Sequence, residues 1–158
     1  MRILNFIIAM VISYIPGVFG MFFSPGRSIP AALWYNSLRT PSITPSGTIS
    51  AIIWNVLYAL LGIALFLVID SKRNDIRKGR AYGLFGAHVV LNAAWSWVFF
   101  GMNWMWIGLA LIVGMIIIAF MMQSEFHKFN KSAGYLVWPY IIWLFFALFL
   151  NASLIFLN

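Results

Sequence analysis

Long apolar stretches separated by short polar connectors fill most of the 158-residue chain. A helix needs about 20 apolar residues to cross the hydrocarbon core of a bilayer, and five stretches reach that length. They are Leu4–Phe23, Thr48–Ile69, Ala81–Phe100, Met105–Ser124 and Gly134–Leu157. The acidic residues Asp70, Asp75 and Glu125 fall at the ends of stretches or between them, as expected because charge is costly at membrane depth. The pattern predicts an all-α integral membrane protein, a five-helix transmembrane bundle in one domain covering residues 1–158.

Composition excludes several other classes of protein. With 63% hydrophobic and 8% charged residues, the chain does not fit an ordinary soluble domain. It contains no cysteine, which excludes a disulfide framework, a thiolate nucleophile and a cysteine metal site. The first stretch follows Arg2, as a secretory signal would, but no small-residue cleavage site precedes Pro25. We therefore interpret it as the first span.

Positive charge is distributed unevenly between the two sides of the predicted bundle. With five spans, the amino end and the second and fourth connectors share one side. That side carries eight of the ten basic residues: Arg2, Lys72, Arg73, Arg77, Lys78, Arg80, Lys128 and Lys131. The other side carries Arg27 and Arg39. Cytoplasmic loops are enriched in Lys and Arg, so we predict a multi-pass protein of the bacterial plasma membrane with its amino end cytoplasmic and its carboxyl end outside. The net charge of +7 then reflects topology and membrane lipid, not a nucleic-acid partner.

The first connector, Ser24–Gly47, is the only long one and contains four of the six prolines. Proline fixes φ and lacks an N–H, so we expect this stretch to resist forming a further helix, apart from a short amphipathic run at Ala31–Tyr35. Loops of this length are typical of lids, binding loops or linkers. Trp34 and Tyr35 argue against disorder, and both a lid and an interfacial aromatic anchor explain them.

The third span has two distinct faces when its residues are placed at about 100° intervals. One face is small: Gly79, Gly83, Gly86, Ala87, Val90 and Ala94. The other is polar and aromatic: His88, Asn92, Trp95, Ser96 and Phe99. Small residues let helices approach closely in lipid, so Gly83, Ala87 and Val90 are candidates for a homodimer interface. Packing within the bundle explains them equally well.

Aromatic area with a few polar groups recurs on two other spans. Trp54 and Tyr58 share a face of the second span, with Asn55 and Gly62 nearby, and the fifth span aligns Tyr140, Trp143, Ala147 and Asn151. Together with the third span, these faces suit a large, flat, apolar ligand with few polar groups. The alternative is a packed core in which Asn and Trp side chains satisfy one another.

Catalytic and metal chemistry finds little support in the residues. His88 is the one histidine within a span and has no carboxylate or second histidine at ligand spacing. We expect a neutral, hydrogen-bonded imidazole and no metal site. The sequence has no Ser–His–Asp set, carboxylate pair or phosphate loop, which argues against hydrolysis. Aromatic side chains leave open the oxidative or photochemical turnover of a bound pigment.

Four segments, in order, resemble motifs of the translocator protein family, also called TspO/MBR or tryptophan-rich sensory proteins. Trp34–Pro41 with Pro45 resembles the first-loop signature of the family, and Trp54 with Leu57, Tyr58 and Gly62 resembles its second helix. The third and fifth helices are matched by Leu91–Gly101, and by Pro139–Trp143 followed by Phe146, Ala147, Leu150 and Asn151. The resemblance covers nearly the whole chain.

The resemblance implies a homodimeric five-helix bundle whose first loop caps an intramembrane pocket. It implies binding of porphyrins such as protoporphyrin IX and of benzodiazepine-type molecules, with no obligatory cofactor. Family pocket residues match Tyr35, Trp54, Asn92, Trp95, Trp143 and Ala147, to which the helix faces add Tyr58 and Phe99. The lid would comprise Trp34, Arg39, Pro41 and Pro45.

Some residues depart from the family pattern. Ile43 stands where the family usually has Trp, and Ser46 replaces a proline. The segment Leu154–Asn158 lacks the Tyr and basic residue of a cholesterol motif, so we do not expect tight sterol binding.

Three functions remain in order of preference. The first is a porphyrin-binding protein or sensor, with Arg27 and Arg39 attracting the propionates. The second is a transporter of tetrapyrroles or other amphipathic molecules. The third is a light- or reactive-oxygen-dependent activity that degrades porphyrin, with Trp54 and Trp143 as its candidate catalytic residues.

Overall fold

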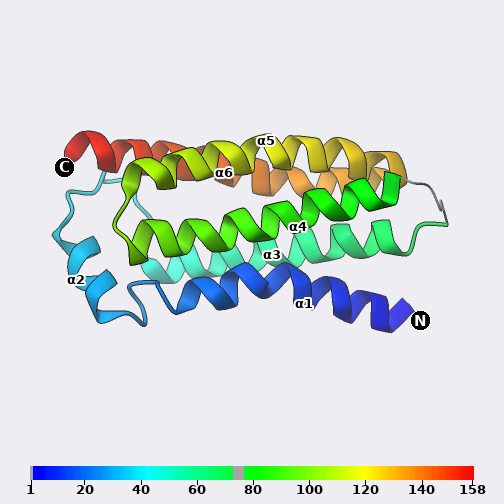
Figure 1. Cartoon of the computed structure of the whole chain (residues 1–158), viewed down its shortest axis with the longest axis horizontal. Coiled ribbons are helices and arrows are strands. Elements are labelled where there is room, and N and C mark those ends of the chain that lie inside the picture. The colour runs from blue at the N-terminus through cyan, green and yellow to red at the C-terminus, as the bar shows by residue number, and fades with distance from the viewer. Residues whose placement is uncertain (1, 73–76) are drawn as a thin grey trace.

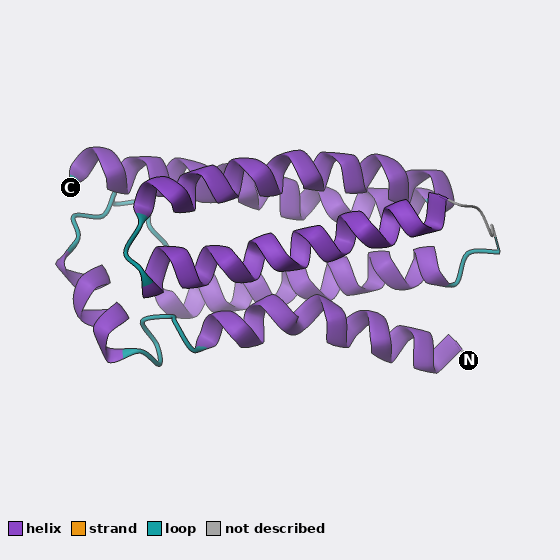
Figure 2. Cartoon of the chain, viewed as in Figure 1, coloured by secondary structure: helices purple, strands orange, loops and turns teal. Residues whose placement is uncertain are grey.

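The computed structural model describes residues 2–72 and 77–158, which form helices and no strand (Figures 1 and 2). The elements are α1 (Arg2–Met21), α2 (Ile29–Ser37), α3 (Gly47–Ile69), α4 (Arg77–Ser96), the π-helical segment η1 (Trp97–Gly101), α5 (Met105–Phe129) and α6 (Lys131–Leu157). Five helices are long and apolar enough to cross a membrane, with α4 and η1 forming one span, Lys78–Gly101. The predicted fold class is confirmed.

The five long helices run side by side and are joined at alternate ends of the bundle (Figure 1). Helix α1 packs against α3 and α4, α5 packs against α4 and α6, and α3 packs against α6. This order closes a ring of neighbours, α1–α3–α6–α5–α4. The short helix α2 and the carboxyl end of the chain lie at one end of the bundle, and the amino end lies at the other (Figure 1).

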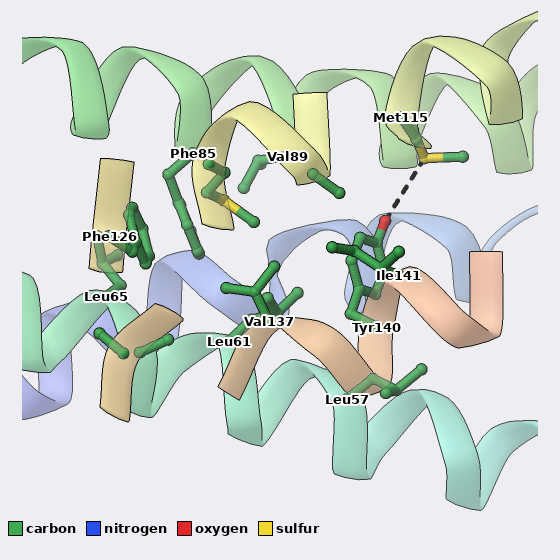
Figure 3. Close-up of a cluster of buried hydrophobic side chains, with 14 of the residues drawn as sticks. Leu57, Leu61, Leu65, Phe85, Val89, Met115, Phe126, Val137, Tyr140 and Ile141 are labelled. Carbon is green, nitrogen blue, oxygen red and sulfur yellow. Dashed lines mark hydrogen bonds between the residues drawn. The ribbon is translucent and has the colours of Figure 1, made fainter. Parts of the chain in front are cut away.

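The hydrophobic core occupies the half of the bundle farther from α2. Most of its side chains come from α3, α4, α5 and α6 and interdigitate between the helices, and Ala9 of α1 joins them (Figure 3). Leu61, Phe126 and Val137 are fully enclosed there. Helix α1 approaches this core closely because Gly62 carries no side chain. A Cβ atom at Gly62 would lie 2.6 Å from the Met10 sulfur.

Helix α2 corrects the expectation that the proline-rich connector would resist becoming a helix. Pro30 lies in the first turn of α2, where N–H groups have no partner within the helix, so its missing donor costs nothing. The Ser28 side chain caps this turn by accepting a hydrogen bond from the Ala31 N–H at 3.4 Å. The helix ends at Ser37, and the segment 38–46 that follows contains Pro41 and Pro45 and has no helix.

Basic residues that were predicted to share one side make an ion pair and hydrogen bonds at the end of the bundle away from α2. Arg2 pairs with Asp70 at 2.9 Å, and Lys78 donates to the carbonyl oxygens of Ile69 and Ser71 at 3.2 and 2.9 Å. Arg73, Asp75 and the side chain of Arg77 lie outside the described residues.

Helix α5 continues to Phe129, beyond the predicted end of the span at Ser124, so Glu125 lies within the helix, near its end. Glu125 is buried within α5 and pairs with Lys128 at 2.8 Å and with Arg80 at 3.6 Å. Two cations therefore compensate the burial of this carboxylate, as the cost of a buried charge requires.

Candidate functional site

A cavity of about 700 Å³ lies beneath α2, in the half of the bundle opposite the core. Its walls come from α1, α3, α4 with η1, and α6, while α2 and the segment before α3 cover it. All eight residues predicted to bind a ligand line this one cavity: Tyr35, Trp54, Tyr58, Asn92, Trp95, Phe99, Trp143 and Ala147. The structure therefore brings together side chains from four separate helices.

A hydrogen-bonded chain crosses the floor of the cavity and separates it from the core. The Tyr58 hydroxyl donates to Asn92 Oδ1 at 3.0 Å, and Asn92 Nδ2 donates to the Tyr140 hydroxyl at 3.0 Å. Tyr140 in turn donates to the Met115 sulfur at 3.7 Å (Figure 3). Asn92 is thus satisfied by two tyrosines, so the alternative of a core in which Asn and Trp pair with each other is wrong for this residue.

Aromatic rings form two stacked groups on the walls. On α3, Trp54 stacks on Tyr58 with ring centroids 5.6 Å apart, and it meets Trp143 of α6 edge-on at 6.2 Å. On α4 and η1, Trp95 stacks on Phe99 at 5.0 Å with planes only 12° apart. Rings that pack on one another hold these walls rigid and present broad flat surfaces.

The cavity lining is uncharged. Its residues, as far as the structure describes the chain, include no Lys, Arg, Asp, Glu or His. Four buried polar atoms on lining residues have no hydrogen-bond partner among the described residues: Thr44 Oγ1, Trp95 Nε1, Trp143 Nε1 and Asn151 Oδ1. Such a cavity suits an apolar body with few polar groups, and any carboxylate of a ligand would have to stay at the mouth.

Helix α1 forms a wall of the cavity that the sequence analysis missed. A Cβ atom at Gly17 would lie 2.7 Å from the Tyr58 ring, and one at Gly20 would lie 2.7 Å from Ser96 Oγ. The absence of side chains at these positions lets α1 approach α3 and α4 and close the cavity. Two glycines three residues apart in an apolar span were the available signal.

The predicted lid residues have different positions. The Trp34 ring packs against Phe99 at 5.4 Å, and Tyr35 packs against Phe100 at 5.6 Å, so α2 docks on η1. Tyr35 also lines the cavity, and burial raises the pKa of its phenol. Of the remaining residues, Pro45 lines the cavity, Pro41 lines an outer groove of about 410 Å³, and Arg39 is exposed.

The two departures from the family pattern have separate structural outcomes. Ile43 is 59% exposed and lines neither the cavity nor the outer groove. Ser46 caps α3, because its side chain accepts from the Ile49 N–H at 3.3 Å. A serine in place of the family's proline therefore supplies one of the acceptors that the start of a helix needs.

His88 lies below the floor, edge-on to the Tyr140 ring at 4.8 Å. It is buried, and neither ring nitrogen has a hydrogen-bond partner among the described residues. The expected hydrogen bond from this imidazole to another side chain or to the backbone is therefore not present among the described residues. The same described part of the chain contains no group of three His, Cys, Asp or Glu side chains that could hold a metal ion.

The small face of α4 points away from the bundle. Val90 is 66% exposed, and a Cβ atom at Gly79, Gly83 or Gly86 would meet nothing within 4 Å in the described structure. Ala87 is half-buried. The glycines of this face are therefore not used for packing inside the bundle, contrary to the alternative that the sequence left open.

Five helices long and apolar enough to cross a membrane, four of which wall an uncharged aromatic cavity, define an α-helical integral membrane protein. The TspO/MBR family matches the chain over residues 7–157. The chain belongs to this family.

Relatives from bacteria and animals agree with this assignment. The tryptophan-rich protein TspO of Chlorobaculum tepidum is 33% identical over 144 residues, 90% of this chain and 88% of the relative. The translocator protein of Bos taurus is 33% identical over 122 residues, covering 75% of this chain and 70% of the relative. The tryptophan-rich sensory protein of Cereibacter sphaeroides is 30% identical over 125 residues, covering 79% and 77%.

Proposed function

We propose that the chain is a membrane binding protein or sensor for porphyrins, such as protoporphyrin IX, and for similar flat hydrophobic ligands. The observation that carries this proposal is the uncharged cavity of about 700 Å³ with stacked aromatic walls. Pockets for drug-sized ligands measure about 300–1,000 Å³ and are mostly apolar with a few polar groups. A tetrapyrrole ring has this character over most of its surface.

The carboxylates of a porphyrin would remain at the mouth of the cavity, because no lining residue described in the structure carries a positive charge. Arg27 and Arg39 are exposed at the α2 end of the bundle. Arg27 directly follows the lining residue Gly26, and Arg39 directly precedes Thr40 of the outer groove. These two cations are placed to attract carboxylates without entering the cavity.

A titration of the purified, detergent-solubilised protein with protoporphyrin IX in the dark tests this proposal through tryptophan quenching and pigment absorbance. We expect saturable quenching and an affinity at least tenfold lower in Trp143→Phe, which removes a ring from the wall. Trp138→Phe is the matched control, because Trp138 lies on the same helix and does not line the cavity. Absence of saturable binding, or equal effects of both substitutions, would contradict the proposal.

Direct contact between Trp54 and Trp143 favours light-dependent degradation of bound porphyrin as a second function. Both rings line the cavity and could be oxidised beside an excited pigment. Illumination of the complex in air should then yield a new pigment product. The product should be absent from the double variant Trp54→Phe/Trp143→Phe and from wild-type protein kept in the dark.

The exposed small face of α4 supports a homodimer through Gly83, Ala87 and Val90. Because the sequence has no cysteine, Val90→Cys introduces a single thiol per chain. Oxidation of this variant in membranes should give a disulfide-linked dimer. Ile117→Cys, exposed on α5, is the control and should stay monomeric.

The distribution of Lys and Arg supports a bacterial plasma membrane protein with its amino end in the cytoplasm. An impermeant thiol reagent applied to intact cells should then label Arg27→Cys but not Lys72→Cys.

A further inference from the structure

The cover of the cavity is attached to the helix bundle on two sides by different kinds of contact. On one side, the α2 rings of Trp34 and Tyr35 pack against Phe99 and Phe100 of η1. On the other side, the segment 38–46 meets the end of α6 through hydrogen bonds to the side chain of Asn158. The first attachment is apolar and partly buried, whereas the second is polar and exposed.

The Asn158 amide binds both backbone groups of one lid residue. Its Oδ1 accepts from the Arg39 N–H at 2.8 Å, and its Nδ2 donates to the Arg39 carbonyl oxygen at 3.1 Å. The same Nδ2 also donates to the Leu154 carbonyl oxygen of α6 at 2.9 Å. One side chain therefore ties the segment 38–46 to the last turn of α6.

This tie lies next to the cavity. Leu154, whose carbonyl oxygen anchors Asn158, lines the cavity. Thr44 and Pro45, on the same segment as Arg39, line it from above. The segment from Arg39 to Pro45 is therefore the part of the cover that faces α6, and releasing it would uncover the cavity on that side.

We propose that Asn158 is a clasp that holds the cover closed on the α6 side, so that its release is the step through which a ligand enters and leaves the cavity. This inference rests on the proposed function for the identity of the ligand. Exposed hydrogen bonds with little buried apolar area open more readily than packed rings. The segment 38–46 should therefore lift while α2 stays docked on η1, and Asn158 acts as a positioning residue.

Amide hydrogen exchange tests the clasp without any ligand. Asn158→Ala and the near-isosteric Asn158→Leu both remove the acceptor of the Arg39 N–H, so exchange across the segment 38–46 should accelerate in both variants. Ser153→Ala is the control, because the Ser153 hydroxyl donates to the Phe149 carbonyl oxygen of its own helix at 2.8 Å and has no bond to the cover among the described residues. Unchanged exchange in the Asn158 variants would overturn the clasp.

Protoporphyrin IX binding followed by stopped-flow fluorescence tests whether the clasp controls ligand exchange. Loss of two hydrogen bonds between the cover and α6 should raise both the association and the release rates about tenfold, while Kd changes less than threefold. A role confined to stability would not raise both rates together. Faster amide exchange with unchanged ligand rates would overturn the gating role.

A cross-link provides the opposite perturbation. The chain has no cysteine, so Arg39→Cys/Asn158→Cys can be joined by a short, reductant-cleavable bifunctional thiol reagent. Protein loaded with protoporphyrin IX before cross-linking should retain the pigment and release it on reduction, whereas either single variant should release it throughout. Release at the same rate with the cross-link intact would overturn the proposal. If the wild type binds no porphyrin, the proposed function fails, and amide exchange alone then decides the clasp.

Discussion

The two halves of the bundle are built from the same long helices but are filled differently. In the half away from α2, Leu61, Phe126 and Val137 are fully enclosed and interdigitate with their neighbours (Figure 3). In the half beneath α2, the residues around the open space include several Trp, Tyr, Phe and Gly, and about 700 Å³ stays open. The difference shows how one bundle can hold both a core and a cavity. In the core, aliphatic side chains and the stacked pair Phe85–Phe126 fill the space between helices, whereas in the other half the stacked rings line the walls and leave the space between them open.

The boundary between the halves is polar. Tyr58, Asn92 and Tyr140, which reach across from α3, α4 and α6, satisfy one another. In lipid an unpaired amide at this depth would be costly. The hydrogen bonds among these three side chains therefore fix the relative heights of α3, α4 and α6. We infer that the floor fixes where the core ends and the cavity begins.

The largest expected effect on stability comes from truncation in the filled half. Leu61→Ala should lower the free energy of unfolding by about 2 kcal/mol, because it leaves a void among enclosed side chains, while lipid reduces the transfer contribution. Leu150→Ala is the matched control in the hollow half, since Leu150 already borders the cavity. Thermal unfolding in detergent compares the two. Equal losses would contradict the contrast between the halves.

Enlarging a side chain should destabilise the filled half more than the hollow half, because only the hollow half has space for it. Ala147→Leu places extra methyl groups in the cavity, so it should cost less than about 1 kcal/mol of stability, whereas overpacking a filled core costs about 1–3 kcal/mol. It should also weaken protoporphyrin IX binding at least tenfold. Ala119→Leu, in the fully enclosed core of α5, is the control that should destabilise the protein. Unchanged porphyrin affinity in Ala147→Leu would show that the ligand does not reach this wall.

The floor can be weakened without changing its shape. Tyr140→Phe removes the hydroxyl that Asn92 Nδ2 donates to, and leaves a buried N–H without an acceptor, at a cost of about 1–3 kcal/mol. The further change Asn92→Leu removes the unpaired amide but leaves the Tyr58 hydroxyl without its acceptor, so it should recover at most part of this loss. A double-mutant cycle by thermal unfolding measures the coupling energy between Tyr140 and Asn92. Strictly additive effects would mean that their hydrogen bond does not contribute to stability.

The spans and most of the residues of the cavity wall could be predicted from the sequence, for physical reasons. Each span must be apolar along its whole length, so the pattern predicts the spans, and a helical wheel with the family motifs selects faces such as Trp54–Tyr58. The lid was only partly predicted. The prolines of the connector argued against a helix, but Pro30 falls in the one turn where a missing N–H is harmless.

Hydrogen-bond partners were not predictable in the same way. That Asn92 pairs with Tyr58 and Tyr140 depends on the relative heights of three helices, which no single helix encodes. The contact between Asn158 and Arg39 joins residues 119 apart in the chain. Helix α1 was missed because glycines such as Gly17 carry no side chain that would mark a cavity wall.

The smallest expected effect concerns His88, which lies on the core side of the floor. Its ring nitrogens have no partner among the described residues, so an apolar replacement of similar volume removes two costly polar atoms. His88→Leu should therefore change the free energy of unfolding by less than about 1 kcal/mol and can increase it, provided that the edge contact with the Tyr140 ring contributes little. A loss above about 2 kcal/mol in His88→Leu would mean that the imidazole makes a hydrogen bond, for instance to buried water, and that the polar boundary extends one helical turn deeper than the floor.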